Sequence, residues 1–181
     1  QLGMSWACAI EALYIAIHEP RRKILLVSRT FDQAIELLGH AKEAYNSIPE
    51  KIKLTNRILP DGTIPVLLKM ECKIVEDKMT FANKSEIFSC PNNAETVRGY
   101  KAYRLYWDEA AKFPHEEEME KAIIPTLSRG GKVTYNSTHQ GTNSRFYDNC
   151  EKAKAGTSKF RFYYLEIPWW ECPDPAYQEQ V

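Results

Sequence analysis

The segment of residues 104–111, Arg-Leu-Tyr-Trp-Asp-Glu-Ala-Ala, constrains the fold of this chain more than any other. A short apolar run leads directly into two adjacent carboxylates, Asp108 and Glu109. Such a run is typical of a buried strand that ends at the edge of a sheet. Two acids at that point suit a Walker B segment, in which the first serves Mg²⁺ and the second the water that attacks a γ-phosphate.

Composition sets the limits of the fold and of the partners. The chain has 181 residues, enough for one domain with a real core, and its 44% hydrophobic and 27% charged residues are ordinary for a globular protein. Its net charge is zero, so any contact with DNA must come from a local basic patch. The cysteine count of five is odd and includes no CxxC pair, which argues against a disulfide framework or a zinc site and favours a reducing compartment. No apolar run has the length of a membrane span, and we expect no signal peptide.

The hydrophobic pattern alternates between helix and strand. Residues 5–18 are apolar and predict a buried helix, and residues 23–28 predict a strand that is covered on both faces. Residues 30–47 repeat apolar side chains at helical spacing. This order predicts an α/β fold in which a mostly parallel central sheet is flanked by helices.

The second half continues the alternation after a less regular middle. Residues 79–81 and 86–89 predict a small hairpin, and residues 97–100 a loop that leads into the acidic strand. Farther on we expect a helix, a strand, a second helix with Asn143 as its N-cap, and an aromatic strand, at residues 115–127, 132–137, 143–153 and 160–167 respectively. Residues 168–181 are proline-rich and predict an irregular tail.

The chain opens with Gln-Leu-Gly-Met-Ser-Trp, which has the features of the end of a phosphate-binding loop. Gly3 lets backbone amides approach phosphate oxygens, the helix that follows offers its positive end, and the Ser5 hydroxyl can hold Mg²⁺. Met4 occupies the place where such loops usually carry lysine.

These motifs together resemble the ATPase domain of the large terminase subunit of tailed double-stranded DNA viruses. The resemblance rests on the opening segment, on Ile-Leu-Leu-Val-Ser-Arg, on Arg-Gly-Tyr shortly before the acidic strand, and on Asn-Ser-Thr-His-Gln-Gly-Thr-Asn-Ser-Arg-Phe. It implies a RecA-like P-loop NTPase, a hydrolase that uses ATP and Mg²⁺ as a molecular motor to package double-stranded DNA into a procapsid. It further implies a homo-oligomeric ring, a portal protein and a small terminase subunit as partners, and the host cell cytoplasm as its location.

The resemblance also implies roles for single residues. Glu109 would polarise the attacking water, and Arg98 would act as an arginine finger on the nucleotide of the neighbouring subunit. Ser5 and Asp108 would hold Mg²⁺. Contacts to the nucleotide would come from Gln1, Leu2, Gly3, Met4, Ser5, Trp6, Ser137 and Thr138. The family pattern often has proline after the Ser-Thr pair, where this chain has His139.

Domain limits follow from the same resemblance. Residues 1–170 would form the motor domain without the strand that precedes the phosphate loop, and residues 171–181 would lead to an absent C-terminal nuclease domain. In this family the basic residue of the loop can stand at the loop's start, which would lie before Gln1. We therefore expect the isolated fragment to be inactive, because it lacks the start of the loop and has no neighbouring subunit for a finger to reach.

Two alternatives remain open from the sequence. A helicase or translocase domain of the superfamily 2 type also carries an Asp-Glu-Ala-Ala box and a Ser-Thr motif. Met4 allows a catalytically inactive nucleic-acid-binding scaffold. Basic residues form three clusters that could contact DNA, with nothing to choose among them: Arg21 to Lys23; Lys51, Lys53 and Arg57; Lys152, Lys154, Lys159 and Arg161.

Overall fold

A six-stranded sheet forms the centre of the computed structural model, which describes residues 3–53, 66–158 and 162–167. Its strand order is β4-β5-β6-β1-β7-β8, and β6, β1, β7 and β8 run parallel while β4 and β5 form an antiparallel edge. The strands are β1 (Lys23–Val27), β4 (Cys72–Ile74), β5 (Lys78–Phe81), β6 (Glu86–Cys90), β7 (Ala102–Asp108) and β8 (Leu127–Asn136). The mostly parallel sheet predicted from the sequence is confirmed.

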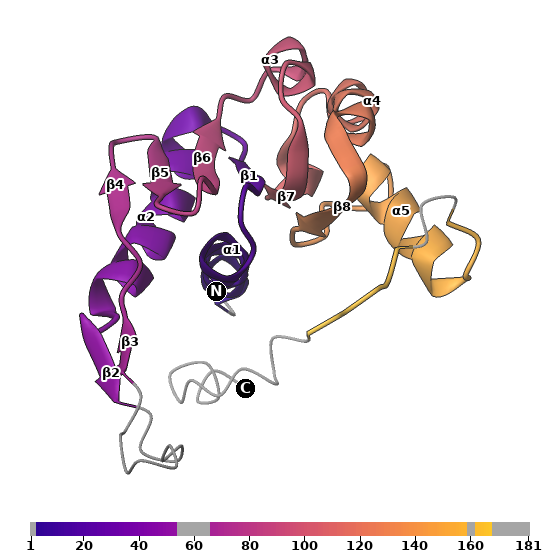
Figure 1. Cartoon of the computed structure of the whole chain (residues 1–181). Coiled ribbons are helices and arrows are strands. Elements are labelled where there is room, and N and C mark those ends of the chain that lie inside the picture. The colour runs from indigo at the N-terminus through magenta and orange to yellow at the C-terminus, as the bar shows by residue number, and fades with distance from the viewer. Residues whose placement is uncertain (1–2, 54–65, 159–161, 168–181) are drawn as a thin grey trace.

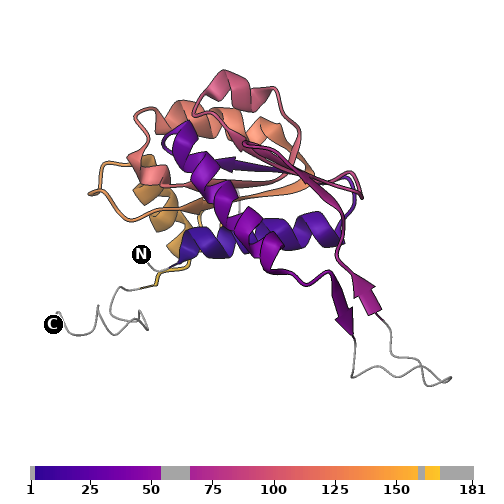
Figure 2. The same ribbon diagram turned by 90° about the vertical axis from the view of Figure 1, so that its left-hand side faces the viewer.

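Helices cover both faces of this sheet, as Figures 1 and 2 show. On one face lie α1 (Met4–His18) and α2 (Phe31–Ser47), and on the other lie α3 (Ala94–Arg98) and α4 (Glu116–Thr126). The short helix η1 (Ala110–Lys112) follows β7, and α5 (Arg145–Lys154) packs beside α4 and η1. A separate pair, β2 (Lys51–Lys53) and β3 (Val66–Leu68), extends away from the sheet in both views.

The central strand β1 explains why both faces need cover. Ile24 and Leu26 belong to the core under α1 and α2, while Leu25 and Val27 belong to the core on the other face. All four side chains are completely buried. Successive residues of a strand point to opposite faces, so a continuous apolar run requires two packed layers.

Arg104 ties α1 to the two strands at its side. Its guanidinium donates to both carboxylate oxygens of Glu11 on α1, at 2.9 Å each, and to Thr134 Oγ1 on β8, at 2.8 Å. The same guanidinium lies over the ring of Tyr106. Because Arg104 itself belongs to β7, these contacts set the position of α1 relative to both β7 and β8.

Four local expectations were wrong. Residues 94–98 form the helix α3, which Asn93 caps through hydrogen bonds from the N–H groups of Glu95 and Thr96, so the segment before β7 is more than a loop. Strand β8 starts already at Leu127 and accommodates its glycines in an irregularity opposite β7. The cap of α5 is Ser144, whose hydroxyl accepts from Tyr147 N–H. Residues 162–167 form no strand, and residues 160–161 and 168–181 lie outside the described residues.

Replacing Arg104 should test the tie between α1 and the sheet. We expect Arg104→Ala to lower the free energy of unfolding by about 1–3 kcal/mol, because Thr134 and the Tyr106 ring lose a partner that is only 12% exposed. Urea denaturation of the purified chain measures this change. The matched control is Arg98→Ala, whose exposed side chain makes no ion pair with the described residues and should change stability by less than about 0.5 kcal/mol. Equal losses in both variants would contradict the assignment.

Candidate nucleotide-binding site

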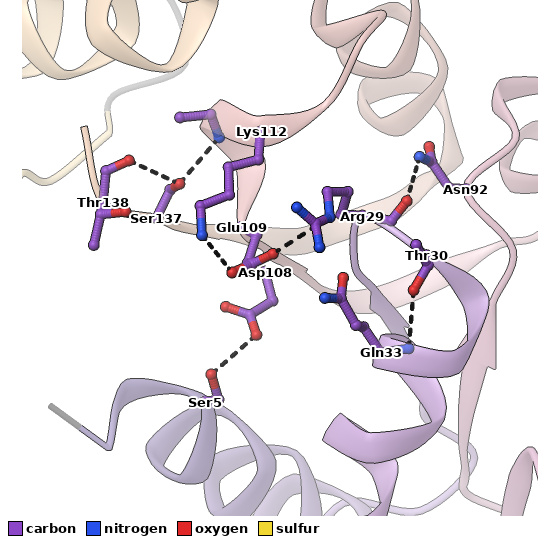
Figure 3. Close-up of polar contacts among 11 residues, drawn as sticks. Ser5, Arg29, Thr30, Gln33, Asn92, Asp108, Glu109, Lys112, Ser137 and Thr138 are labelled. Atoms are coloured by element: carbon purple, nitrogen blue, oxygen red, sulfur yellow. Dashed lines mark hydrogen bonds and ion pairs between the residues drawn. The ribbon is translucent and has the colours of Figure 1, made fainter. Parts of the chain in front are cut away.

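The first turn of α1 meets the end of β7. Ser5 Oγ donates a hydrogen bond of 2.9 Å to Asp108 Oδ2, although the two residues stand 103 positions apart in the chain. Figure 3 shows the two side chains pointing toward each other across the space between helix and strand. The structure therefore brings the two residues that we expected to share a metal into direct contact.

Asp108 is fixed from a second side. Asn136 lies opposite Asp108 in the register of β7 and β8, and its Nδ2 donates to Asp108 Oδ1 at 2.7 Å. Both carboxylate oxygens thus have a partner, and the side chain is only partly buried. Its orientation is set by two neighbours while it stays open to a ligand from solvent.

A hydroxyl and a carboxylate fit Mg²⁺. This ion prefers oxygen ligands and is usually bound by one or two side chains, with phosphate oxygens and waters completing its octahedron. Among the described residues no group of three or more His, Cys, Asp or Glu side chains could hold a metal. The pair Ser5 and Asp108 is therefore suited to a metal that arrives with a phosphate ligand, and less suited to a metal held by protein alone.

The start of α1 has the features of an anion site. Gly3 has a φ of 69°, a left-handed conformation that glycine adopts without steric cost, and a Cβ at this position would meet nothing within 4 Å. No side chain caps the helix, and its first turn carries no acid. The amide groups and the positive end of the helix dipole are thus available to a phosphate beside Ser5.

Glu109 sits in a strained position between two cations. Its φ of 52° is left-handed, which costs a residue with a side chain about 1–3 kcal/mol. Lys112 Nζ donates to Glu109 Oε1 at 2.7 Å, and Arg29 Nε lies 3.9 Å from Glu109 Oε2. This second oxygen is buried and has no hydrogen-bond partner. The carboxylate that we expected to polarise water is therefore held mainly by Lys112 (Figure 3).

Ser137 connects the end of β8 to the segment that follows Glu109. Its Oγ accepts from the backbone N–H of Ala111 at 3.1 Å and donates to the carbonyl of Thr138 at 3.1 Å. Thr138 itself is exposed. Ser137 thus contacts η1, which carries Lys112, and links β8 to the position of Glu109.

Cys8 lies one helical turn after Ser5 and close to the same acid. Burial raises the pKa of its thiol to about 11, and the negative charges of Asp108 and Glu11 contribute to this rise in pKa. The thiol therefore stays protonated at neutral pH and serves as packing in this core. The four cysteines among the described residues, Cys8, Cys72, Cys90 and Cys150, are all free.

Arg98 lies apart from this cluster, whereas Met4 and Trp6 belong to the same helix as Ser5. Gln1 and Leu2 are outside the described residues. Met4 begins α1, and Trp6 stacks on His40 of α2 with ring centroids 4.3 Å apart. Arg98 ends α3, which precedes the first residue of β7, whereas Asp108 ends that strand. A strand of this length separates its two ends by about 20 Å, so Arg98 stands at the opposite edge of the sheet.

Sequence reasoning missed three residues of the cluster: Arg29, Lys112 and Asn136. For each, the sequence holds at most a partial signal. Arg29 follows the strand next to β7, where the carboxyl ends of parallel strands meet, and Asn92 Nδ2 holds its carbonyl at 2.8 Å. Lys112 stands three residues after Glu109. Asn136 ends the strand that pairs with β7.

Comparison with known proteins identifies the family. The family model for the N-terminal part of the terminase large subunit, T4likevirus-type, matches residues 1–178. The chain belongs to this terminase large subunit family. A comparison with curated proteins finds no match.

Solved terminase structures share the fold. The ATPase domain of the Thermus phage P74-26 large terminase, in an arginine-to-alanine mutant, is 23% identical with a TM-score of 0.55, covering 83% of this chain and 60% of that one. The large terminase of a thermophilic bacteriophage, solved in complex with ADP, is 12% identical with a TM-score of 0.65, covering 98% of this chain and 40% of that one. The chain thus spans less than two thirds of either relative and has their RecA-like fold. In its described part, no helix combines the length and apolar character needed to cross a membrane.

Replacing Asp108 should separate metal-assisted from metal-independent nucleotide binding. We expect Asp108→Asn to reduce by about tenfold or more the gain in ATP affinity that Mg²⁺ gives, because a neutral amide replaces the carboxylate beside Ser5. Titration of a fluorescent ATP analogue with and without Mg²⁺ into the natural full-length protein measures this gain. Glu118→Gln, an exposed acid on α4, is the matched control. An undiminished Mg²⁺ effect in Asp108→Asn would exclude Asp108 as a ligand.

Proposed function

We propose that this chain is the ATP-hydrolysing motor domain of a viral terminase, which couples MgATP hydrolysis to the packaging of double-stranded DNA into a procapsid. The observation that carries the proposal is the contact between Ser5 and Asp108, with Glu109 next to it, in a chain of the terminase large subunit family. The ADP bound to the related terminase of the thermophilic bacteriophage supports nucleotide as the ligand.

Binding of MgATP would use the first turn of α1 and the end of β7. The amides at the start of α1 would receive phosphate oxygens, and Ser5 and Asp108 would hold Mg²⁺. The ion, when bound, offsets negative charge on the phosphates. Asn136 keeps Asp108 in the orientation that this requires.

Glu109 would position the attacking water. Each carboxylate oxygen carries two lone pairs, and Oε2 of Glu109 has no hydrogen-bond partner, so Oε2 is the oxygen that we assign to the water. Lys112 holds the other oxygen at 2.7 Å and Arg29 stands 3.9 Å from Oε2. Because both cations flank the acid next to Asp108, negative charge arriving with the nucleotide competes with Glu109 for them.

The residues at the end of β8 would respond to the presence of the nucleotide and to its hydrolysis. Ser137 contacts the backbone of η1 between Glu109 and Lys112, so a shift of Glu109 on hydrolysis reaches β8 through a single hydrogen bond. Thr138 is exposed beside it and is the residue we assign to a contact with the nucleotide. This arrangement suits the coupling role that we expected from the Ser-Thr pair.

Arg98 would act on a neighbouring subunit. It lies at the far edge of the sheet from Asp108, so it is remote from the nucleotide of its own chain. A head-to-tail ring brings α3 of one subunit against a different face of the next. We therefore propose a homo-oligomeric ring in which Arg98 offsets charge on the neighbour's γ-phosphate. A portal protein, a small terminase subunit and the host cytoplasm complete the proposal.

The two alternatives fare differently. The family match over residues 1–178 favours a terminase over a superfamily 2 helicase. The inactive scaffold rests on Met4 alone, which stands where such loops usually carry lysine. The site still contains positive charge, because Arg29 and Lys112 flank Glu109. An ATPase assay decides between an active and an inactive domain.

Glu109→Gln should abolish turnover and leave nucleotide binding intact. We expect the ATPase rate of the natural full-length protein with DNA to fall by about 100-fold or more, since the amide cannot accept a proton from the attacking water. Phosphate release measures the rate, and Glu118→Gln on α4 is the control that removes a charge of the same kind. An unchanged rate in Glu109→Gln would show that this residue is not the catalytic one.

Mixing two inactive variants should restore activity if Arg98 works on its neighbour. Arg98→Ala keeps its own Ser5, Asp108 and Glu109, while Glu109→Gln keeps its arginine. In a mixed ring, intact sites of the first variant receive the arginine of the second, so we expect the mixture to hydrolyse ATP faster than either variant alone. Rates that simply average would place the effect of Arg98 within its own chain.

A further inference from the structure

A basic cleft lies at the edge of the sheet away from Asp108. Because β1 and β7 are parallel neighbours, the turns that lead into them meet at this edge. Between the turns opens a cleft with a volume of about 560 Å³. Its lining consists of four basic residues, two tyrosines and a glycine: Arg21, Arg22, Lys23, Gly99, Tyr100, Lys101 and Tyr103.

The charge of this cleft is only partly neutralised. Arg22 pairs with Glu19 at 2.9 Å and lies over the ring of Tyr103, and Lys23 has Glu86 at 3.8 Å, which Lys78 also contacts. Arg21 and Lys101 are exposed and make no ion pair with the described residues. Two positive charges therefore remain at the mouth of the cleft after the nearby acids are counted.

The cleft is built on fixed backbone. Arg21 has a left-handed φ of 60° and its N–H donates to the carbonyl of Asn83 at 3.2 Å, while Arg22 N–H donates to Ser85 Oγ at 3.1 Å. Asn83 also donates to the carbonyls of Ala16 and Ile17 in α1, at 2.8 and 3.2 Å. The turn between β5 and β6 thus fixes the backbone at Arg21, a residue with a strained conformation whose side chain extends from a defined point.

The lining indicates which class of partner fits. Cores of protein interfaces are depleted in lysine, whereas arginine, lysine and tyrosine hydroxyls are the usual donors to nucleic-acid phosphates. The cleft offers these groups and no aliphatic side chain. We propose that this cleft binds the phosphate backbone of duplex DNA through Arg21 and Lys101. The choice of DNA as the polyanion rests on the proposed function.

The structure also separates this basic cluster from the other two. Lys154 is engaged with Glu151 at 3.1 Å and lies over the ring of Tyr164. Arg57 lies outside the described residues, as do Lys159 and Arg161. Arg21 to Lys23 is the cluster whose positive charge the fold gathers around a concave surface, together with Lys101 from a distant part of the sequence.

DNA binding by the purified chain tests the proposal without any ATPase activity. The test variant combines Arg21→Gly, which removes the guanidinium and suits the left-handed backbone, with Lys101→Gln. We expect about tenfold weaker binding of a fluorescent duplex at low salt, by anisotropy, and a slope of log K against log salt that is shallower by about 2. The control, Lys73→Gln with Lys132→Gln, removes the same charge from exposed positions on β4 and β8 that make no ion pair with the described residues, and it should weaken binding less than about twofold.

Further arms separate this proposal from its rivals. Arg21→Lys with Lys101→Arg keeps both charges and should bind like the parent chain, and circular dichroism verifies the fold of every variant. Equal weakening in the cleft variant and the control would show that only overall charge matters and would overturn the proposal. So would unchanged DNA affinity together with loss of self-association in sedimentation, because the cleft would then be a subunit contact. Failure of the parent chain to bind duplex DNA would also overturn it, whereas ATP turnover by the full-length protein tests the proposed function separately.

Discussion

The contact between the first turn of α1 and the end of β7 is the constraint on which the site depends. Ser5 and Asp108 come from the two ends of a long stretch of chain, and their side chains meet only because α1 lies along the sheet in one orientation. Arg104 secures that orientation by binding Glu11 of α1 and Thr134 of β8 from β7. Ile24 and Leu26 of β1, which point to the same face of the sheet, form part of the core against which α1 packs. Without this alignment, the hydroxyl and the carboxylate would remain unrelated surface groups.

Much of this arrangement can be predicted from sequence because it rests on short-range patterns. The apolar run of β1 predicts a strand that is buried on both faces, and the acids after β7 predict a polar edge, so parallel pairing brings Asp108 to the same edge as Ser5. Helix caps and short irregular segments were harder to predict. Ser144 replaces the expected cap of α5, since either of two adjacent polar residues suits that position and only packing decides between them. The strand expected at residues 160–167 was wrong for the described part, residues 162–167, because aromatic content favours strands only where a neighbouring strand is available.

The cations around Glu109 belong to the part that sequence patterns do not reveal. Lys112 reaches Glu109 because η1 turns tightly after β7, and that turn depends on the left-handed backbone of Glu109, which is rare for a residue with a side chain. Arg29 arrives from a different strand, and its position depends on strand order and on the hydrogen bond from Asn92. Such convergence is a property of the tertiary structure, and the spacing of residues along the chain does not encode it.

One helix spans the distance between the two ends of the molecule that we propose to bind phosphate groups. α1 begins beside Asp108 and, after 15 residues or about 22 Å, ends where Asn83 donates hydrogen bonds to the carbonyls of Ala16 and Ile17, close to Arg21. A packed helix is stiff along its axis, so its two ends move together. If phosphate binds and leaves the first turn as proposed, an axial displacement of α1 would reach the turn that holds Arg21. The two edges of the sheet would then be linked by one helix, without a series of separate side-chain movements.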